Sequence, residues 1–355
     1  MAEIFTHAKS FTLESGIRLE QYHLAYTTYG SLSKNKDNVV WIFHALTANS
    51  DAAEWWPGII GEAKLFDPAS HFIICVNIPG SCYGSIGPLE INPATKQPWF
   101  HDFPFFTTRD MIRAYQPLKD FLGIKNIHTG IGGSMGGQQL LEWAIEEPAL
   151  FKHIVLLATN AFHSPWGIAF NATQRHAIEI DPSWPECNEK AGLQGMMVAR
   201  EIALISYRNY NTYNLGQTED TTEKKDHYKS ESYQQYQGIK LARRFNAFSY
   251  YFLSKSMDAH NVGRQRGSVQ KALQRLKAKT LVISISSDIL FPTKEQEFIA
   301  RNIDGAIYRD IDSTFGHDGF LLEYDQISNV ITEFFGEKVA IKKDLAEEKN
   351  ILNTF

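Results

Sequence analysis

Short apolar segments of strand length, without polar alternation, are the feature that most restricts the fold of this chain. Turn-forming residues bound each segment, and the segments lie at 39–43, 72–76, 127–131, 154–157, 280–285 and 306–308. Strands covered on both faces have this pattern, as in a parallel sheet flanked by helices. Between them, 108–122 carries apolar residues at helical spacing, and a helix-like segment at 138–145 follows a glycine cluster. The alternation predicts an α/β fold with crossover helices.

The pattern changes in the middle of the chain, where apolar residues such as Met196, Ala199 and Ile202 follow helical spacing and no strand-like segment occurs. An amphipathic segment at 326–335 is expected to close the fold, and the residues after it are charged and lack strong periodicity. The predicted α/β catalytic domain comprises residues 1–160 and 267–336. A helical lid is inserted at residues 161–266, and residues 337–355 form a C-terminal tail.

Composition excludes several classes of protein. The 355 residues are 43% hydrophobic and 21% charged, as in an ordinary globular protein. With a net charge of −5 and scattered basic residues, we expect no nucleic-acid partner. Three cysteines are too few for a disulfide framework, and Cys75 lies in an apolar segment where a buried thiol is expected. No apolar stretch approaches the roughly 20 residues that span a bilayer, and the N-terminus does not resemble a signal peptide, so we expect a cytoplasmic protein without membrane contact.

A glycine-rich segment between a predicted strand and a predicted helix points to a nucleophile. It reads Gly132-Gly133-Ser134-Met135-Gly136-Gly137. A sharp strand-to-helix turn holds its central residue in a strained backbone conformation and needs small neighbours, which exposes the serine hydroxyl above the sheet. The alternative for the motif alone is a structural glycine-rich turn. In its context, the segment predicts Ser134 as a nucleophile.

A serine hydroxyl needs a base, which an acid orients. In α/β-hydrolase enzymes these partners follow the serine in the order acid and then histidine, each after a later strand. Asp288 follows the segment 280–285, and His317 is the only histidine beyond Asp288. The rival acids, Asp304, Asp310 and Asp312, flank the strand before His317 and fit the loop position less well.

An oxyanion hole needs two backbone N–H groups directed at the developing negative charge. One should belong to Met135, directly after the nucleophile. The other should come from the loop after the strand 39–43, where we favour Leu46 over Ala45. His44 lies in the same loop, and its position indicates a structural role.

At this point the chain resembles the homoserine O-acyltransferases of the α/β-hydrolase superfamily, above all the acetyltransferases. The matching segments span most of the chain: His44–Thr47, Asn77–Pro88, Asp102–Pro104, Thr108–Met111, Gly132–Gly137, Ser287–Pro292 and Gly316–Phe320. The resemblance implies an α/β-hydrolase fold with a helical lid and the triad Ser134, Asp288 and His317. The chain departs from many members at Asn261, where they carry aspartate, and at Pro79, where they carry leucine.

The resemblance also implies a site for an amino-acid acceptor. A lid arginine and the aspartate after the catalytic histidine hold the acceptor in this family, and these positions correspond to Arg200 and Asp318. A guanidinium and a carboxylate complement the two charges of a zwitterion. Arg175 is a further matching arginine, which would either line the pocket or brace the lid.

The activity that the resemblance implies is transfer of an acetyl group from acetyl-CoA to L-homoserine through an acyl-serine, giving O-acetyl-L-homoserine for methionine synthesis. Members are often homodimers with lid helices at the interface, so it also implies a homodimer. We expect neither a metal nor a bound cofactor. Homoserine O-succinyltransferase, serine O-acyltransferase and carboxylesterase activities are the alternatives, and a non-catalytic binding protein would keep the pocket without needing the triad.

Overall fold

The apolar segments form the centre of one eight-stranded sheet in the computed structural model, which describes residues 2–336. The strands lie in the order β1-β4-β6-β5-β7-β8-β9-β10. Their bounds are β1 (Glu3–His7), β4 (Tyr22–Tyr29), β5 (Val39–Phe43), β6 (Phe72–Val76), β7 (Ile127–Gly133), β8 (Phe151–Leu157), β9 (Lys279–Ile285) and β10 (Ile307–Ile311). Strands β5 to β10 are parallel to one another. At one edge of the sheet, β4 pairs antiparallel with β6, and β1 pairs antiparallel with β4. The parallel sheet predicted from the sequence is confirmed, and the antiparallel edge is an addition to it.

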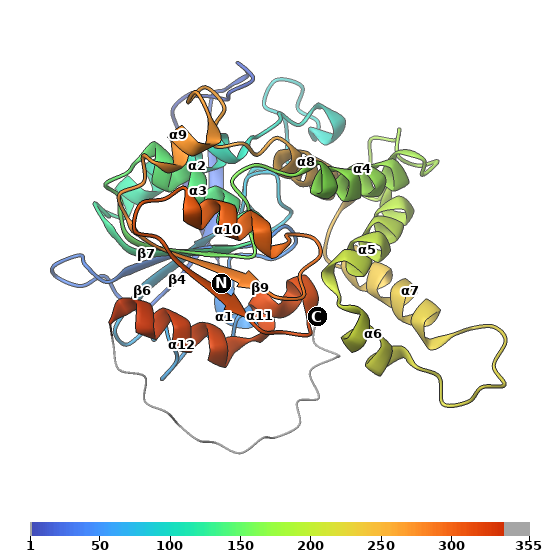
Figure 1. Cartoon of the computed structure of the whole chain (residues 1–355). Helices are drawn as coiled ribbons and strands as arrows, with labels where there is room; N and C mark the ends of the chain where they lie inside the picture. Colours follow the sequence, from blue (N-terminus) through green and yellow to red (C-terminus); the bar gives the residue numbers. More distant parts are fainter. Residues whose placement is uncertain (1, 337–355) are drawn as a thin grey trace.

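Helices cover both faces of the sheet (Figure 1). Those outside the middle of the chain are α1 (Ala52–Trp55), α2 (Thr108–Phe121), α3 (Met135–Glu146), α9 (Val269–Leu273), α10 (Thr293–Arg301), α11 (Gly319–Leu322) and α12 (Tyr324–Phe335). A short separate hairpin pairs β2 (Phe11–Thr12) with β3 (Arg18–Leu19), and two 3-10 turns occupy η1 (Phe100–Asp102) and η2 (Gly316–Asp318).

The central strand β5 shows why its sequence lacks polar alternation. Trp41 and Phe43 pack into the core beneath α2 and α3, whereas Val40 and Ile42 pack into the core beneath α1 and α12. All five residues of the strand are buried. A strand with apolar cores on both faces needs an apolar side chain at every position, which is the pattern that predicted the fold.

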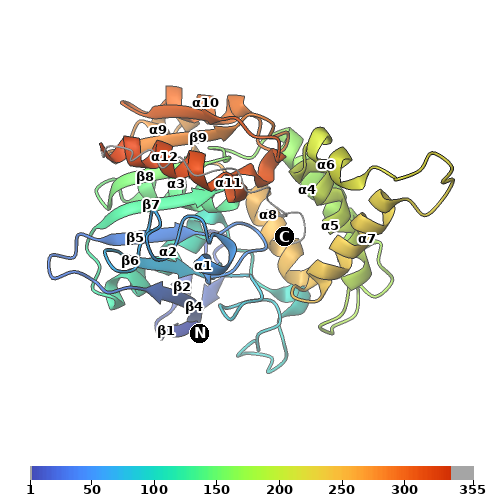
Figure 2. The ribbon, with the colours of Figure 1, turned by 90° about the horizontal axis from the view of Figure 1, so that it is seen from below.

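The middle of the chain forms five helices at one end of the sheet, separate from the layers that cover its faces (Figure 2). They are α4 (Pro165–Glu179), α5 (Leu193–Tyr207), α6 (Tyr210–Gln217), α7 (Lys229–Ala242) and α8 (Ala247–Asp258). The entering and returning segments run side by side, because His163 N–H donates to His260 O (2.9 Å) and Val262 N–H donates to Ala161 O (3.0 Å). We call residues 161–266 the lid, as in the sequence prediction.

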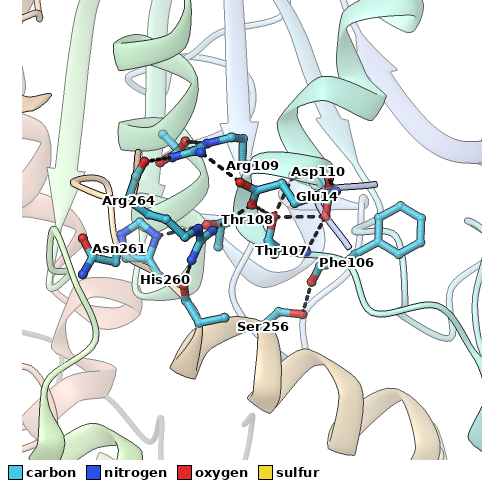
Figure 3. Close-up of polar contacts among 12 residues, drawn as sticks. Glu14, Phe106, Thr107, Thr108, Arg109, Asp110, Ser256, His260, Asn261 and Arg264 are labelled. Carbon is cyan, nitrogen blue, oxygen red and sulfur yellow. Dashed lines mark hydrogen bonds and ion pairs between the residues drawn. The ribbon is translucent and has the colours of Figure 1, made fainter. Parts of the chain in front are cut away.

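The returning segment of the lid is anchored to α2 by a polar network (Figure 3). Glu14 accepts hydrogen bonds from Arg109 and Arg264, each at 2.8 Å. His260 Nδ1 lies 3.1 Å from the Thr108 hydroxyl, and Ser256 donates to Phe106 O at 2.6 Å. These contacts join the lid to the sheet domain at the start of α2.

Other sequence predictions fall outside this sheet and lid. Cys75 is buried, as predicted, and Cys82 and Cys187 are also free thiols. The predicted tail, 337–355, lies outside the described residues. Within residues 2–336, no helix combines the length and the apolar character needed to cross a bilayer.

Candidate active site

The turn between β7 and α3 holds Ser134 in a strained conformation. Its backbone has φ 55° and ψ −128°, which a residue with a side chain rarely adopts. A Cβ at Gly132 would lie 2.6 Å from the backbone of Gly136, and one at Gly136 would lie 2.0 Å from Phe43 O. The glycines are therefore required because backbones approach closely at this turn.

Hydrogen bonds fix this turn from both sides of the serine. Ser134 N–H donates to Leu157 O at 3.0 Å, and the Thr159 hydroxyl donates to Ser134 O at 2.7 Å. The nucleophile position therefore depends on β8 as well as on β7. Strained residues persist only when the surrounding structure determines them in this way, and they cluster at functional sites.

Asp288 and His317 meet on the loops that follow β9 and β10. His317 Nδ1 lies 2.6 Å from Asp288 Oδ2, and both side chains are buried. Because a carboxylate only accepts hydrogen bonds, this contact makes Nδ1 the donor and leaves Nε2 available to accept a proton. The rival acids are not in this position: Asp310 contacts Ser284, and Asp312 is exposed.

The acid and the imidazole are each held in place by further contacts. Asp288 Oδ1 accepts from the backbone N–H groups of Leu290 (2.8 Å) and Phe291 (2.9 Å), which leaves Oδ2 for the histidine. The Phe291 ring stacks on the His317 ring with centroids 5.0 Å apart, and Phe320 packs against it edge-on. Rotation of the imidazole is therefore restricted on both sides.

Ser134 and His317 line the same cavity, of about 370 Å³, between the sheet domain and the lid. Leu46 and Ala45 lie in its wall, on the loop after β5. Within the described part of the chain, the N–H groups of Leu46 and Met135 have no hydrogen-bond acceptor. An unpaired N–H on each of these residues is what an oxyanion hole would require of them.

The histidine at the start of the loop after β5, His44, has the structural environment that its position predicts. His44 is fully buried, its Nε2 accepts from Ile78 N–H (3.1 Å), and its Nδ1 lies 2.9 Å from Ala45 O. Burial lowers the pKa of His44 to about 4, so the ring is neutral at neutral pH. It braces the loop that carries Leu46.

Arg200 and Asp318 line the cavity with the serine and the histidine. Asp318 forms an ion pair with the buried Arg208, with Nη1 and Oδ2 3.1 Å apart. Sequence reasoning missed Arg208, because the end of a lid helix gives no signal that it contacts a loop 110 positions later. The Arg200 guanidinium lies over the Tyr207 ring, 5.4 Å from its centroid, on the same helix α5.

Arg175 is placed elsewhere. It is not among the residues that line this cavity; it pairs with Asp258 (2.6 Å) and donates to Ser254 Oγ (3.2 Å). These contacts join α4 to α8 within the lid. They agree with the bracing alternative for this arginine.

A second lid arginine reaches the loop after β5. Arg244, the second residue after the end of α7, donates to Thr47 O at 2.6 Å and to the Tyr83 hydroxyl. The lid therefore contacts the chain segment that carries Leu46. No local sequence pattern singles out this residue.

Comparison with known proteins confirms the fold and identifies similar proteins within the fold family. Residues 38–324 match the family model described as the alpha/beta hydrolase fold. The chain is 47% identical over 335 residues to a homoserine O-acetyltransferase of Cyclobacterium marinum, covering 94% of this chain and 95% of that protein.

Solved structures show the same architecture. The crystal structure of homoserine O-acetyltransferase from Bacillus anthracis superposes with a TM-score of 0.88 at 25% identity, over 96% of this chain and 98% of that one. An acetylester hydrolase from Corynebacterium glutamicum superposes with a TM-score of 0.84 at 24% identity, over 95% of this chain and 96% of that one. At that identity the hydrolase shows a shared fold alone, so the fold does not separate acyl transfer from hydrolysis.

Proposed function

Because the chain belongs to the homoserine O-acetyltransferase family of α/β hydrolases, we propose that it transfers an acetyl group from acetyl-CoA to the hydroxyl of L-homoserine. The products are O-acetyl-L-homoserine and CoA. The observation that carries this proposal is the similarity to an acetyltransferase over 94% of this chain, a share that includes both its sheet domain and its lid. The Asp288–His317 pair beside a strained serine supplies matching chemistry.

In the first half-reaction, His317 Nε2 takes the proton of Ser134 while Oγ attacks the thioester carbonyl. The N–H groups of Met135 and Leu46 donate to the oxyanion that forms. The carbon–sulfur bond then breaks, and CoA leaves as a thiol with the proton from His317. Asp288 remains ionised and stabilises the imidazolium.

In the second half-reaction, the homoserine hydroxyl gives its proton to His317 and attacks the acetyl-serine. The bond to Ser134 Oγ breaks, and the serine recovers the proton. Arg200 binds the acceptor carboxylate, and Asp318 binds its ammonium group. Arg208 pairs with Oδ2 of Asp318 and holds the Asp318 carboxylate in place.

Transfer must proceed faster than hydrolysis by water. The hydroxyl of a bound acceptor in attack geometry can have an effective molarity of about 10⁵ M, far above the molar concentration of water. In this proposal the lid is required for transfer, since it carries Arg200 and Arg208 and covers the serine.

A thiol-release assay tests the proposal directly. Acetyl-CoA and succinyl-CoA are each supplied with homoserine, serine or water alone, and the products are identified by mass spectrometry. We expect homoserine with acetyl-CoA to give the highest rate. Equal thiol release with and without homoserine would identify a hydrolase instead, and a preference for succinyl-CoA or serine would reassign the substrate.

We also propose that the protein is a homodimer formed through the lid. The lid exposes large apolar side chains, including Ile205 (61%), Tyr210 (77%) and Leu215 (85%). Ile205 and Tyr210 also line a hollow of about 620 Å³, together with Tyr213 and Tyr228. Exposed apolar patches of this kind mark protein interfaces. Sedimentation velocity should give a dimer that Leu215→Glu dissociates; a monomeric wild-type protein would contradict this proposal.

A further inference from the structure

The cavity wall that the lid supplies carries three positive charges: Arg200 on α5, Lys240 on α7 and Arg244 beyond the end of α7. Within the described residues, none of the three forms an ion pair with a carboxylate. Glu54 lies in the same wall but is not paired with them, and Asp318 is paired with Arg208.

This cluster is electrostatically unfavourable without an anion. Partial burial and the neighbouring charges of Arg244, Arg200 and Arg208 lower the pKa of Lys240. Of these four cations, only Arg208 is paired with a carboxylate among residues 2–336. The chain as a whole has a net charge of −5, so the cluster is a local reversal of sign. Like charges held together in a cavity indicate an anionic ligand.

Two anions would enter this cavity in the proposed reaction. The acceptor carries one carboxylate, which Arg200 suffices to bind. The donor carries a diphosphate and a phosphate monoester, the latter with a charge of about −1.5 to −2 at pH 7. Two further cations exceed what the acceptor needs, whereas a polyanion matches them.

We propose that Lys240 and Arg244 bind the phosphate groups of the acyl-CoA donor at the mouth of the cavity. This inference rests on the proposed function. Both residues line the cavity that Ser134 lines, so the pantetheine arm would extend from them toward the serine. Arg244 can orient a phosphate while its Nη1 remains bound to Thr47 O, because a guanidinium has five N–H donors.

Lys240→Gln provides the cleaner test, because Arg244 also holds the loop after β5. Binding of CoA and of pantetheine, which lacks phosphates, is measured by calorimetry without homoserine. We expect Lys240→Gln to weaken CoA binding about 10-fold and to reduce the preference for CoA over pantetheine by the same factor. Lys240→Arg should restore most of that preference.

Arg243→Gln is the matched control. Arg243 follows α7 directly, as Arg244 does one residue later, but it is exposed and does not line the cavity. It should change CoA binding less than twofold, which separates a phosphate contact from a general effect of charge at this helix end. Raising the salt concentration should weaken binding of CoA more than binding of pantetheine.

The outcomes separate this inference from the proposed function. Equal losses for CoA and pantetheine, or no loss for either, would overturn the phosphate contact even if homoserine is acetylated. A CoA-specific loss in a protein that does not acetylate homoserine would support the contact and reject the acceptor assignment.

Discussion

The sheet domain and the lid hold their functional side chains in different ways. In the sheet domain, Ser134, Asp288 and His317 are 4–6% exposed. The turn around Ser134 and Oδ1 of Asp288 are fixed by hydrogen bonds with backbone groups, and Oδ2 of Asp288 contacts His317. In the lid, Arg200, Lys240 and Arg244 are at least partly exposed and have no carboxylate partner among residues 2–336.

This difference separates chemistry from recognition. In the proposed mechanism, the reacting groups are positioned before any substrate binds, so their geometry costs nothing at the moment of reaction. In the same proposal, the lid cations are neutralised by the substrates, so their charge serves binding. Changes in the sheet domain should therefore abolish all turnover, whereas changes in the lid should alter which acceptor or donor is used.

Ser134→Ala gives the largest expected effect. Without the nucleophile, both thiol release with homoserine and thiol release in water should fall at least about 10⁴-fold. A fluorophosphonate probe should label the wild-type protein and not the variant. Substantial remaining turnover by the variant would show that another group carries the reaction, and probe labelling would distinguish both enzyme assignments from a binding protein.

Arg200→Gln tests whether this lid residue affects acceptor binding without affecting the triad. Loss of a charge-assisted pair with the acceptor carboxylate should lower kcat/KM for homoserine about 100-fold, because such contacts contribute about 1.5–3 kcal/mol. Thiol release in water should fall much less, since the triad is untouched. Arg243→Gln again serves as the control, and equal losses in both reactions would place Arg200 in the chemistry.

Arg208→Lys should give a smaller effect through Asp318. A lysine keeps the charge but not the planar donor geometry, so Asp318 should be less well oriented. We expect KM for homoserine to rise about 10-fold, with kcat changed little. A fall in kcat with unchanged KM would mean that this ion pair positions the neighbouring His317 rather than the acceptor.

The pH dependence of stability tests the junction of the two regions. Burial lowers the pKa of His260 to about 3, whereas an unfolded histidine titrates near 6.5. The unfolded state therefore binds the extra proton between these values, and the free energy of unfolding falls as pH falls below about 6.5. His260→Asn should reduce this slope by up to about 1.4 kcal/mol per pH unit, measured by urea denaturation at pH 5 and 7. An unchanged slope would mean that His260 is not buried as a neutral ring.

The central sheet could be predicted because each of its strands carries its own signal. The segments at 39–43 and 72–76 are strands with the predicted bounds, and β7 and β8 extend theirs by a few residues. The antiparallel strand β4 was not predicted. Its residues 22–29 mix apolar and polar side chains, because it lies next to the sheet edge and is only partly covered at one end.

The residues of the site likewise fall into those that the sequence predicts and those that only the structure reveals. The strand-turn-helix motif around Ser134 is local, and the order of Asp288 and His317 along the chain follows the order of the strands, so all three could be proposed from the sequence. Arg208 and Arg244 could not, because their partners, Asp318 and Thr47, lie 110 and 197 residues away. Contacts between a lid helix and a distant loop leave no periodic pattern.

The sequence by itself determined the alternation of strands and helices, the glycine turn and the helical character of the middle segment, because hydrophobic spacing and steric limits act over neighbouring residues. Only the tertiary structure decided which lid cations line the cavity that Ser134 lines and which are paired elsewhere, as Arg175 is with Asp258. The physical reason is that ion pairing and burial depend on distances across the fold, and these are set by how the lid packs on the sheet.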